Sequence, residues 1–165
     1  MQTTIEVSHQ RVPISCSYEI FRENLESIVR KLDPEYARNA LSDPETLKHY
    51  LEGLAGETGL IIFGTQSHGD LLNIYGKPRK AVQYVIGNPL VAIQMTVHDI
   101  RAALYAPLRM IVYEDLEGNV QVEYDLPSTL FGQFGNDEIL RVGLGLDLKL
   151  FNAIKMADME KHLTL

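Results

Sequence analysis

The sequence predicts an α+β fold: a mainly antiparallel sheet of about five strands, with the helices packed largely on one face. Three observations lead to this fold class. Residues 79–86 alternate like a strand, residues 90–104 carry apolar side chains at helical spacing, and residues 110–124 read as two strands joined by a short loop containing Gly118. A chain of 165 residues is near the usual size of one domain, so we expect residues 1–165 to form a single domain.

Composition and charge exclude several classes of protein. With 45% apolar and 22% charged residues, the chain is typical of a folded globular protein. The formal charge of −7 disfavours nucleic acid and anionic membranes as partners. The start lacks the basic and apolar segments of a signal peptide, and no apolar run is long enough for a membrane span. The single cysteine, Cys16, allows no internal disulfide and is interpreted as a small core residue, so we expect a cytoplasmic protein.

The first predicted strand covers residues 5–15. Its apolar positions change parity between Val7 and Val12. Because side chains of a strand alternate strictly between two faces, this change predicts a bulge or bend near residues 9–11. Pro13 has no N–H to donate, which predicts an edge strand.

A cluster of helices follows the first strand. Residues 17–32 have one apolar face at helical spacing, and Ser17 is a suitable N-cap. Asp-Pro-Glu occurs twice, at residues 33–35 and 43–45, and each copy offers a capping carboxylate followed by proline in the first turn. Residues 33–56 are therefore predicted to be short helices that embellish the domain. The apolar run at residues 59–65, bounded by glycines, predicts a buried central strand.

The second half contains the strand of residues 79–86, the turn Gly87-Asn88-Pro89 and one helix over residues 90–104. After the hairpin, Ser128 is interpreted as the N-cap of a short helix. The final segment, residues 137–162, is ambiguous. Its central leucines alternate as in a strand, yet a second set of apolar residues fits a helical face.

Histidine is the first residue type to examine for catalysis or metal binding. The chain has five histidines, and none is paired at the spacing of a zinc-binding helix, so we expect no metal site. Each is otherwise expected to be a surface or capping residue. His68 is the strongest exception, because it follows a buried strand and precedes Gly69 and Asp70 in a loop. His98 is the second candidate. The sequence has no serine-nucleophile motif, phosphate loop or complete dinucleotide fingerprint.

Three residues near the end of the predicted helix form a candidate anion site: Arg101, Tyr105 and Arg109. Arg101 and Tyr105 share a helical face at a spacing of four residues. Two guanidinium groups and a phenol could bind a carboxylate or phosphate through paired hydrogen bonds. The alternative is that Arg101 pairs with Asp99 or Glu114 at the surface while the ring of Tyr105 packs.

A resemblance to a known family rests on four short motifs, which are Ile86-Gly87-Asn88-Pro89, residues 106–109 (Ala-Pro-Leu-Arg), residues 111–114 (Ile-Val-Tyr-Glu) and Glu117-Gly118. With the Asp-Leu-Pro at residues 125–127 and a terminal helix, this order resembles the bacterial family catalogued as domain of unknown function 302. The resemblance covers residues 59–157. It implies a compact α+β fold, often dimeric, a helix over the ambiguous C-terminal segment and no established reaction. Where the family usually has cysteine, this chain has Leu108, which puts any thiolate, redox or metal role of that position in doubt.

The leading functional hypothesis is a protein that binds a small, partly apolar or anionic ligand, with Arg101, Tyr105, Arg109 and His68 as candidate polar contacts. One alternative is a cofactor-free or haem-associated enzyme, in which His68 or His98 acts as base or axial ligand and Arg109 stabilises an anion. Another is a structural or interaction subunit. The residues do not identify a cofactor. A predicted edge strand and the apolar C-terminal segment lead us to expect a homodimer.

Overall fold

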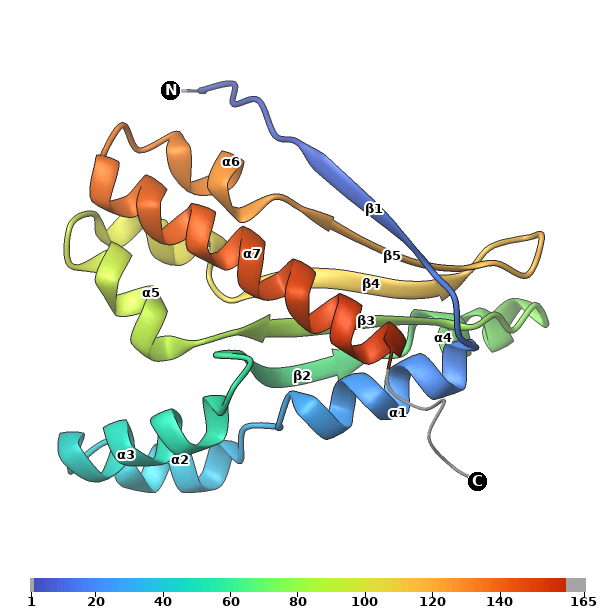
Figure 1. Ribbon diagram of the computed structural model, residues 1–165, viewed down its shortest axis with the longest axis horizontal. Helices are drawn as coiled ribbons and strands as arrows, with labels where there is room; N and C mark the ends of the chain where they lie inside the picture. Colours follow the sequence, from blue (N-terminus) through green and yellow to red (C-terminus); the bar gives the residue numbers. More distant parts are fainter. Residues whose placement is uncertain (1, 160–165) are drawn as a thin grey trace.

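The computed structural model describes residues 2–159 and has a five-stranded antiparallel sheet with the strand order β1-β5-β4-β3-β2 (Figure 1). The strands are β1 (His9–Ile14), β2 (Ile61–Gln66), β3 (Ala81–Gly87), β4 (Leu108–Glu114) and β5 (Val120–Asp125). Each strand pairs antiparallel with its neighbours. The predicted α+β class and sheet of about five strands are therefore confirmed.

Helical segments connect and cover the strands. They are α1 (Tyr18–Ile28), α2 (Pro34–Ala40), α3 (Pro44–Ala55), α4 (His68–Leu71), the 3-10 helix η1 (Leu72–Tyr75), α5 (Pro89–Thr96), the 3-10 helix η2 (Ile100–Tyr105), α6 (Pro127–Gly132) and α7 (Asp137–Met159). The predicted caps are confirmed, because the side chains of Ser17, Asp33 and Asp43 accept hydrogen bonds from the first turns of α1, α2 and α3. None of the helices within residues 2–159 combines the length and the apolar character needed to cross a bilayer.

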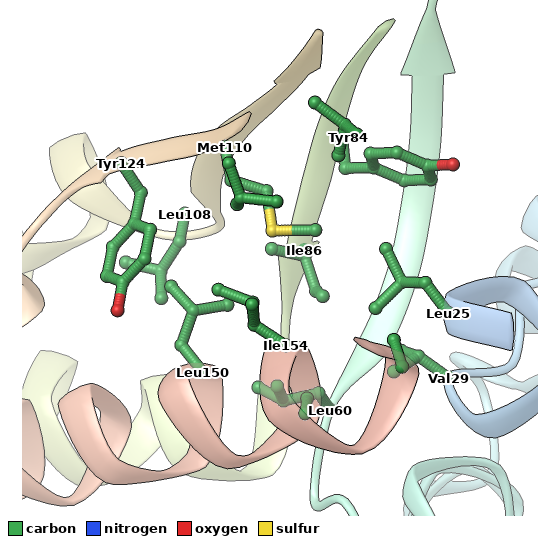
Figure 2. Packing of buried hydrophobic residues seen from close by; sticks show 14 of the residues in the cluster. Leu25, Val29, Leu60, Tyr84, Ile86, Leu108, Met110, Tyr124, Leu150 and Ile154 are labelled. Atoms are coloured by element: carbon green, nitrogen blue, oxygen red, sulfur yellow. The ribbon is translucent and has the colours of Figure 1, made fainter. Parts of the chain in front are cut away.

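The main hydrophobic core lies between one face of the sheet and the helices α1 and α7 (Figure 2). Alternate side chains of the strands point into it, such as Tyr84 of β3 and Met110 of β4, and meet Leu25 of α1 and Ile154 of α7. Strand side chains of the opposite parity are polar or partly exposed, except at β2, where Ile61 packs against α3. We call this second surface, over β1, β5, β4 and β3, the open face.

The first strand differs from the prediction. β1 starts at His9, and its register with β5 is unbroken from His9 to Ile14, so the predicted bulge near residues 9–11 is wrong. The apolar positions change parity because Ile5 and Val7 precede the strand. An irregularity lies instead in β2, between Ile62 and Gly64. The expected edge position of Pro13 is confirmed, since β1 is an outer strand.

The single helix predicted over residues 90–104 is also wrong. α5 ends at Thr96, and a separate 3-10 helix, η2, begins at Ile100. The carboxylate of Asp99 accepts the backbone N–H of Arg101 at 2.9 Å and thus caps a new helix where the first would have continued. The apolar spacing continues through the break, but the α-helical conformation of the backbone does not.

The ambiguous C-terminal segment is one long helix, α7, and residues 160–162 of the predicted range lie outside the described part of the chain. Gly143 explains part of the ambiguity, because a Cβ at this position would lie 3.0 Å from Cα of Ser128. The glycine thus allows α6 to pack closely on α7. Ser128 is not an N-cap as predicted: α6 begins at Pro127, and the backbone N–H of Ser128 donates to Asp147 Oδ1 at 2.9 Å.

Two glycines give a matched test of local packing. A Cβ on Gly69 of α4 would lie 1.8 Å from the carbonyl oxygen of Arg79 and 2.7 Å from N of Ala81, whereas a Cβ on Gly53 of α3 would meet nothing within 4 Å. We expect Gly69→Ala to lower the free energy of unfolding by about 1–3 kcal/mol through overpacking. Gly53→Ala should raise it by about 0.5–1 kcal/mol, because alanine favours a helix interior. Urea denaturation measures both, and equal stability of the two variants would contradict this packing.

Candidate functional site

The largest hollow described lies on the open face, between the sheet and the segment formed by α4 and η1, and has a volume of about 750 Å³. Strand residues form its floor, namely Arg11, Ala81, Ile111, Tyr113 and Glu123. The segment from α4 to η1 forms a wall with His68, Leu71, Leu72, Ile74 and Tyr75. Arg79, Lys80 and Glu114 form the rim. We call this site the open-face hollow.

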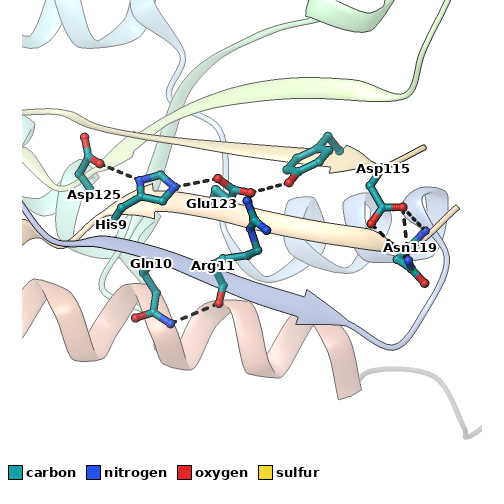
Figure 3. Close-up of polar contacts among 8 residues, drawn as sticks. His9, Gln10, Arg11, Asp115, Asn119, Glu123 and Asp125 are labelled. Carbon is teal, nitrogen blue, oxygen red and sulfur yellow. Dashed lines mark hydrogen bonds and ion pairs between the residues drawn. The ribbon is translucent and has the colours of Figure 1, made fainter. Parts of the chain in front are cut away.

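A network of charged side chains occupies the floor and the adjoining edge strand (Figure 3). Glu123 accepts hydrogen bonds from Arg11 Nε at 2.7 Å and from the hydroxyl of Tyr113. His9 Nε2 lies 2.7 Å from Glu123 Oε2, and its Nδ1 lies 2.9 Å from Asp125 Oδ1. Because ionised carboxylates only accept hydrogen bonds, both contacts are hydrogen bonds when the imidazole of His9 is protonated on both nitrogens.

The pKa shifts in the network have the same cause. Hydrogen bonds to Asp125 and Glu123 raise the pKa of His9. Partial burial alone would raise the pKa of Glu123, but hydrogen bonds from Tyr113, His9 and Arg11 outweigh it and lower that pKa. The hydrogen bond to Glu123 raises the pKa of Tyr113. Glu123 is therefore held in its ionised form by three donors, and its lowered pKa makes it a poor general base.

The rim has one cation, Arg79, that no carboxylate within residues 2–159 neutralises, whereas Lys80 is paired with two carboxylates. Lys80 Nζ lies 3.1 Å from carboxylate oxygens of both Glu19 and Glu114. Arg79 donates from a terminal nitrogen to the backbone carbonyl of Glu114 at 3.1 Å. Within residues 2–159, no carboxylate pairs with Arg79. Its guanidinium, with five N–H donors, has capacity left for an anion.

The wall is apolar and unusually exposed. Ile74 and Tyr75 are each 80% exposed, and Leu71 is 50% exposed. Large apolar residues that gather in this way typically mark an interaction site. The hollow thus combines an apolar wall with the guanidinium of Arg79 on its rim.

The structure brings Tyr105 and Arg109 to one pocket and places the other predicted site residues elsewhere. His68 lines the open-face hollow, whereas His98 lies in a shallow groove between α5 and α7. Arg101 pairs with Asp99 at 2.6 Å, and the ring of Tyr105 packs edge-on against two phenylalanines. Tyr105 and Arg109 line a separate pocket of about 210 Å³. Because residues 100–105 form a 3-10 helix, the α-helical spacing that linked Arg101 to Tyr105 does not apply.

The Gly-Asn-Pro motif borders another cavity, of about 210 Å³, whose lining is almost wholly apolar. Asn88 faces it, but its side chain caps α5 at 2.9 Å and donates to the carbonyl of Gly59 at 3.0 Å. Leu108 also lines this cavity. The motif therefore acts as turn and cap, and the cavity has no free polar group to orient a ligand.

Other reactive groups are poorly placed for chemistry. Burial raises the pKa of Cys16 to about 11, with Asp158 adding to the shift, so this thiol is not a nucleophile at neutral pH. Among residues 2–159, no three His, Cys, Asp or Glu side chains are placed to hold a metal ion. Sequence reasoning missed the network of His9, Arg11, Tyr113 and Glu123. One signal could have found them: all four residues occupy odd-numbered positions in neighbouring strands and therefore lie on the same face of the sheet.

The network predicts a specific pH dependence of stability. Because the pKa of His9 is raised in the folded protein, protonated His9 contributes stability that is fully present below about pH 6.5, the unfolded value, and is lost as the pH rises through the folded pKa. The free energy of unfolding of the wild type should therefore fall across this window, and His9→Gln should remove this part of the fall. Urea denaturation at several pH values measures it, with His49→Gln as the control that keeps the wild-type profile. Identical profiles for wild type and His9→Gln would contradict the assignment.

Comparison with known proteins places the chain in a family. Residues 36–157 match the family described as domain of unknown function DUF302. The fold is similar to the crystal structure of an uncharacterised conserved DUF302 protein from Bacillus stearothermophilus, with a TM-score of 0.64 at 16% identity over 90% of this chain and 97% of the other. No curated protein matches the sequence. Because the family match spans well over half of the chain, the protein belongs to the DUF302 family.

Proposed function

We propose that this protein binds a small, partly apolar organic anion in the open-face hollow. The observation that carries the proposal is that one hollow of about 750 Å³ is lined both by the apolar wall and by Arg79, a cation without a carboxylate partner within residues 2–159. Ligand sites of proteins typically have volumes of about 300–1,000 Å³ and combine apolar surface with a few polar groups.

Each side of the hollow has a distinct role in the proposal. The acidic group of the ligand meets Arg79, whose guanidinium has no carboxylate partner within residues 2–159. The apolar part of the ligand lies against Ile74 and Tyr75 and covers side chains that are otherwise exposed to water.

The network on the floor supports an anion there rather than opposing it. The charge of Glu123 is balanced by Arg11 and His9, both of which lie 2.7 Å from it. The floor therefore presents no unpaired carboxylate at this point. Since three hydrogen bonds hold Glu123 in its ionised form, the same geometry favours binding over acid–base catalysis by this residue.

The contribution of Arg79 to anion binding is tested with the fluorescent arenesulfonate 1-anilinonaphthalene-8-sulfonate. Displacement of this dye by octanoate reports binding of the carboxylate. Wild type should bind the dye, and octanoate should displace it at concentrations at which octan-1-ol does not. Arg79→Gln should weaken octanoate binding by about tenfold, since a charge-assisted hydrogen bond contributes about 1.5 kcal/mol. Arg30→Gln is the matched control, because Arg30 also donates to a backbone carbonyl, that of Gly53, but lies outside the hollow.

Three results would contradict this proposal. Folded wild-type protein that fails to bind both probes would exclude the ligand class. Equal octanoate affinity of Arg79→Gln and Arg30→Gln would exclude Arg79 as the contact for the acidic group. Weakened binding in Arg109→Gln with unchanged binding in Arg79→Gln would move the site to the pocket that Tyr105 and Arg109 line.

The apolar wall is tested separately. Ile74→Ser should weaken octanoate binding by about tenfold, because the ligand would no longer cover a large aliphatic side chain. Binding of the shorter butanoate, measured by calorimetry, should change much less. Leu116→Ser is the control, since Leu116 is 91% exposed in the hairpin loop and lies outside the hollow. Equal losses in the Ile74 and Leu116 variants would contradict a contact with the wall.

A further inference from the structure

We infer that the protein forms a two-fold symmetric homodimer in which the α7 helices of two copies pack antiparallel along one line of six side chains. These are Asp137, Leu140, Leu144, Leu148, Phe151 and Lys155, which we call the α7 stripe. The stripe belongs to the helical side of the molecule, whereas the open-face hollow lies on the other face of the sheet. The inference is therefore independent of the proposed ligand.

The apolar part of the stripe is exposed although α7 is central to the core. Leu148 is 65% exposed, Leu144 51%, Phe151 40% and Leu140 37%. The buried side chains of α7 belong to a different set, which includes Leu146, Leu150 and Ile154. α7 is thus apolar on two sides, and residues 2–159 cover only one of them.

The spacing makes the stripe straight. From Asp137 to Lys155 it advances 18 residues in five steps of three or four, which is 3.6 residues a step, the period of an α-helix. The line therefore runs parallel to the helix axis for about 27 Å at 1.5 Å per residue. A second straight helix can follow it over its whole length.

The charges at the two ends of the α7 stripe favour a second copy as the partner and an antiparallel orientation of the two helices. The stripe has an acid at its first position and an amine at its last, and its midpoint is residue 146. A two-fold axis at this point puts Asp137 beside Lys155 of the partner subunit and Leu144 beside Leu148 of the partner subunit. A parallel pair in register would instead place Asp137 beside Asp137 of the partner subunit, which is repulsive. The stripe therefore complements a second, antiparallel copy of itself.

The two terminal charges are available for this pairing. Within residues 2–159, neither Asp137 nor Lys155 has an oppositely charged partner, and Nζ of Lys155 lies 5.7 Å from the ring centroid of Phe151. A single pair of helices buries an area at the low end of specific interfaces. We therefore expect a dimer that dissociates at micromolar concentrations.

The register is tested by exchanging the two charges and measuring mass by sedimentation equilibrium. At about 50 µM, wild type should approach twice the monomer mass of 18.6 kDa, as expected for a micromolar dissociation constant. Asp137→Lys or Lys155→Glu alone should raise the dissociation constant about tenfold, because like charges then face each other at both ends. The double variant should recover to within about twofold of wild type. Lys48→Glu, on the exposed surface of α3, is the charge-change control and should dimerise as wild type does.

Leu148→Glu tests the apolar centre and should abolish the dimer without unfolding the chain, because Leu148 is 65% exposed. Circular dichroism and thermal unfolding verify the fold of each variant. A monomer at 200 µM wild type, a dimer that survives Leu148→Glu, or a folded double variant that fails to recover would each overturn the inference. Because the stripe is remote from the hollow, octanoate binding by Leu148→Glu should equal that of wild type. Loss of the dimer and loss of the ligand are thus separate results.

Discussion

The packing of α7 across one face of the sheet is the constraint on which the rest of the structure depends. Leu150 and Ile154 enter the same core as alternate strand residues such as Tyr84 and Met110. This contact fixes the face on which each strand is apolar, because a shift of one residue would exchange the two faces. Within the described part of the chain, it also leaves two surfaces largely uncovered: the open face of the sheet and the outer side of α7.

On the open face, which no helix layer covers within residues 2–159, charged side chains form pairs with one another. Glu123 is in the middle of this surface and is shielded by neighbouring strands, so its ionised form depends on donors from β1 and β4. The same donors fasten the edge strand β1 to β5. The apolar wall contributed by Ile74 and Tyr75 lies outside this network and gives the surface its mixed character. A surface of this kind is suited to a ligand that is apolar at one end and charged at the other.

Local elements were predictable because their causes lie close together in the sequence. The caps at Ser17 and Asp33, the hairpin and the turn at Asn88 each depend on residues within four positions of one another. The wrong predictions have causes that the spacing of apolar residues does not reveal. The helix after Pro89 breaks because the carboxylate of Asp99 competes for a backbone N–H, although the apolar spacing continues through the break. Predicted clustering of Arg101 with Tyr105 failed with that helix.

The sequence by itself determined the fold class, the family, the order of elements and most helix starts. These follow from the period of apolar residues and from the stereochemistry of proline, glycine and capping side chains. Tertiary structure alone decided the site. His9 meets Glu123 and Asp125 across 114 and 116 residues, and no local pattern specifies which distant strand will lie beside β1. The helix that the family resemblance implies over the C-terminal segment is confirmed, but tertiary packing decided which of its two apolar sides is buried, because the sheet can cover only one of them.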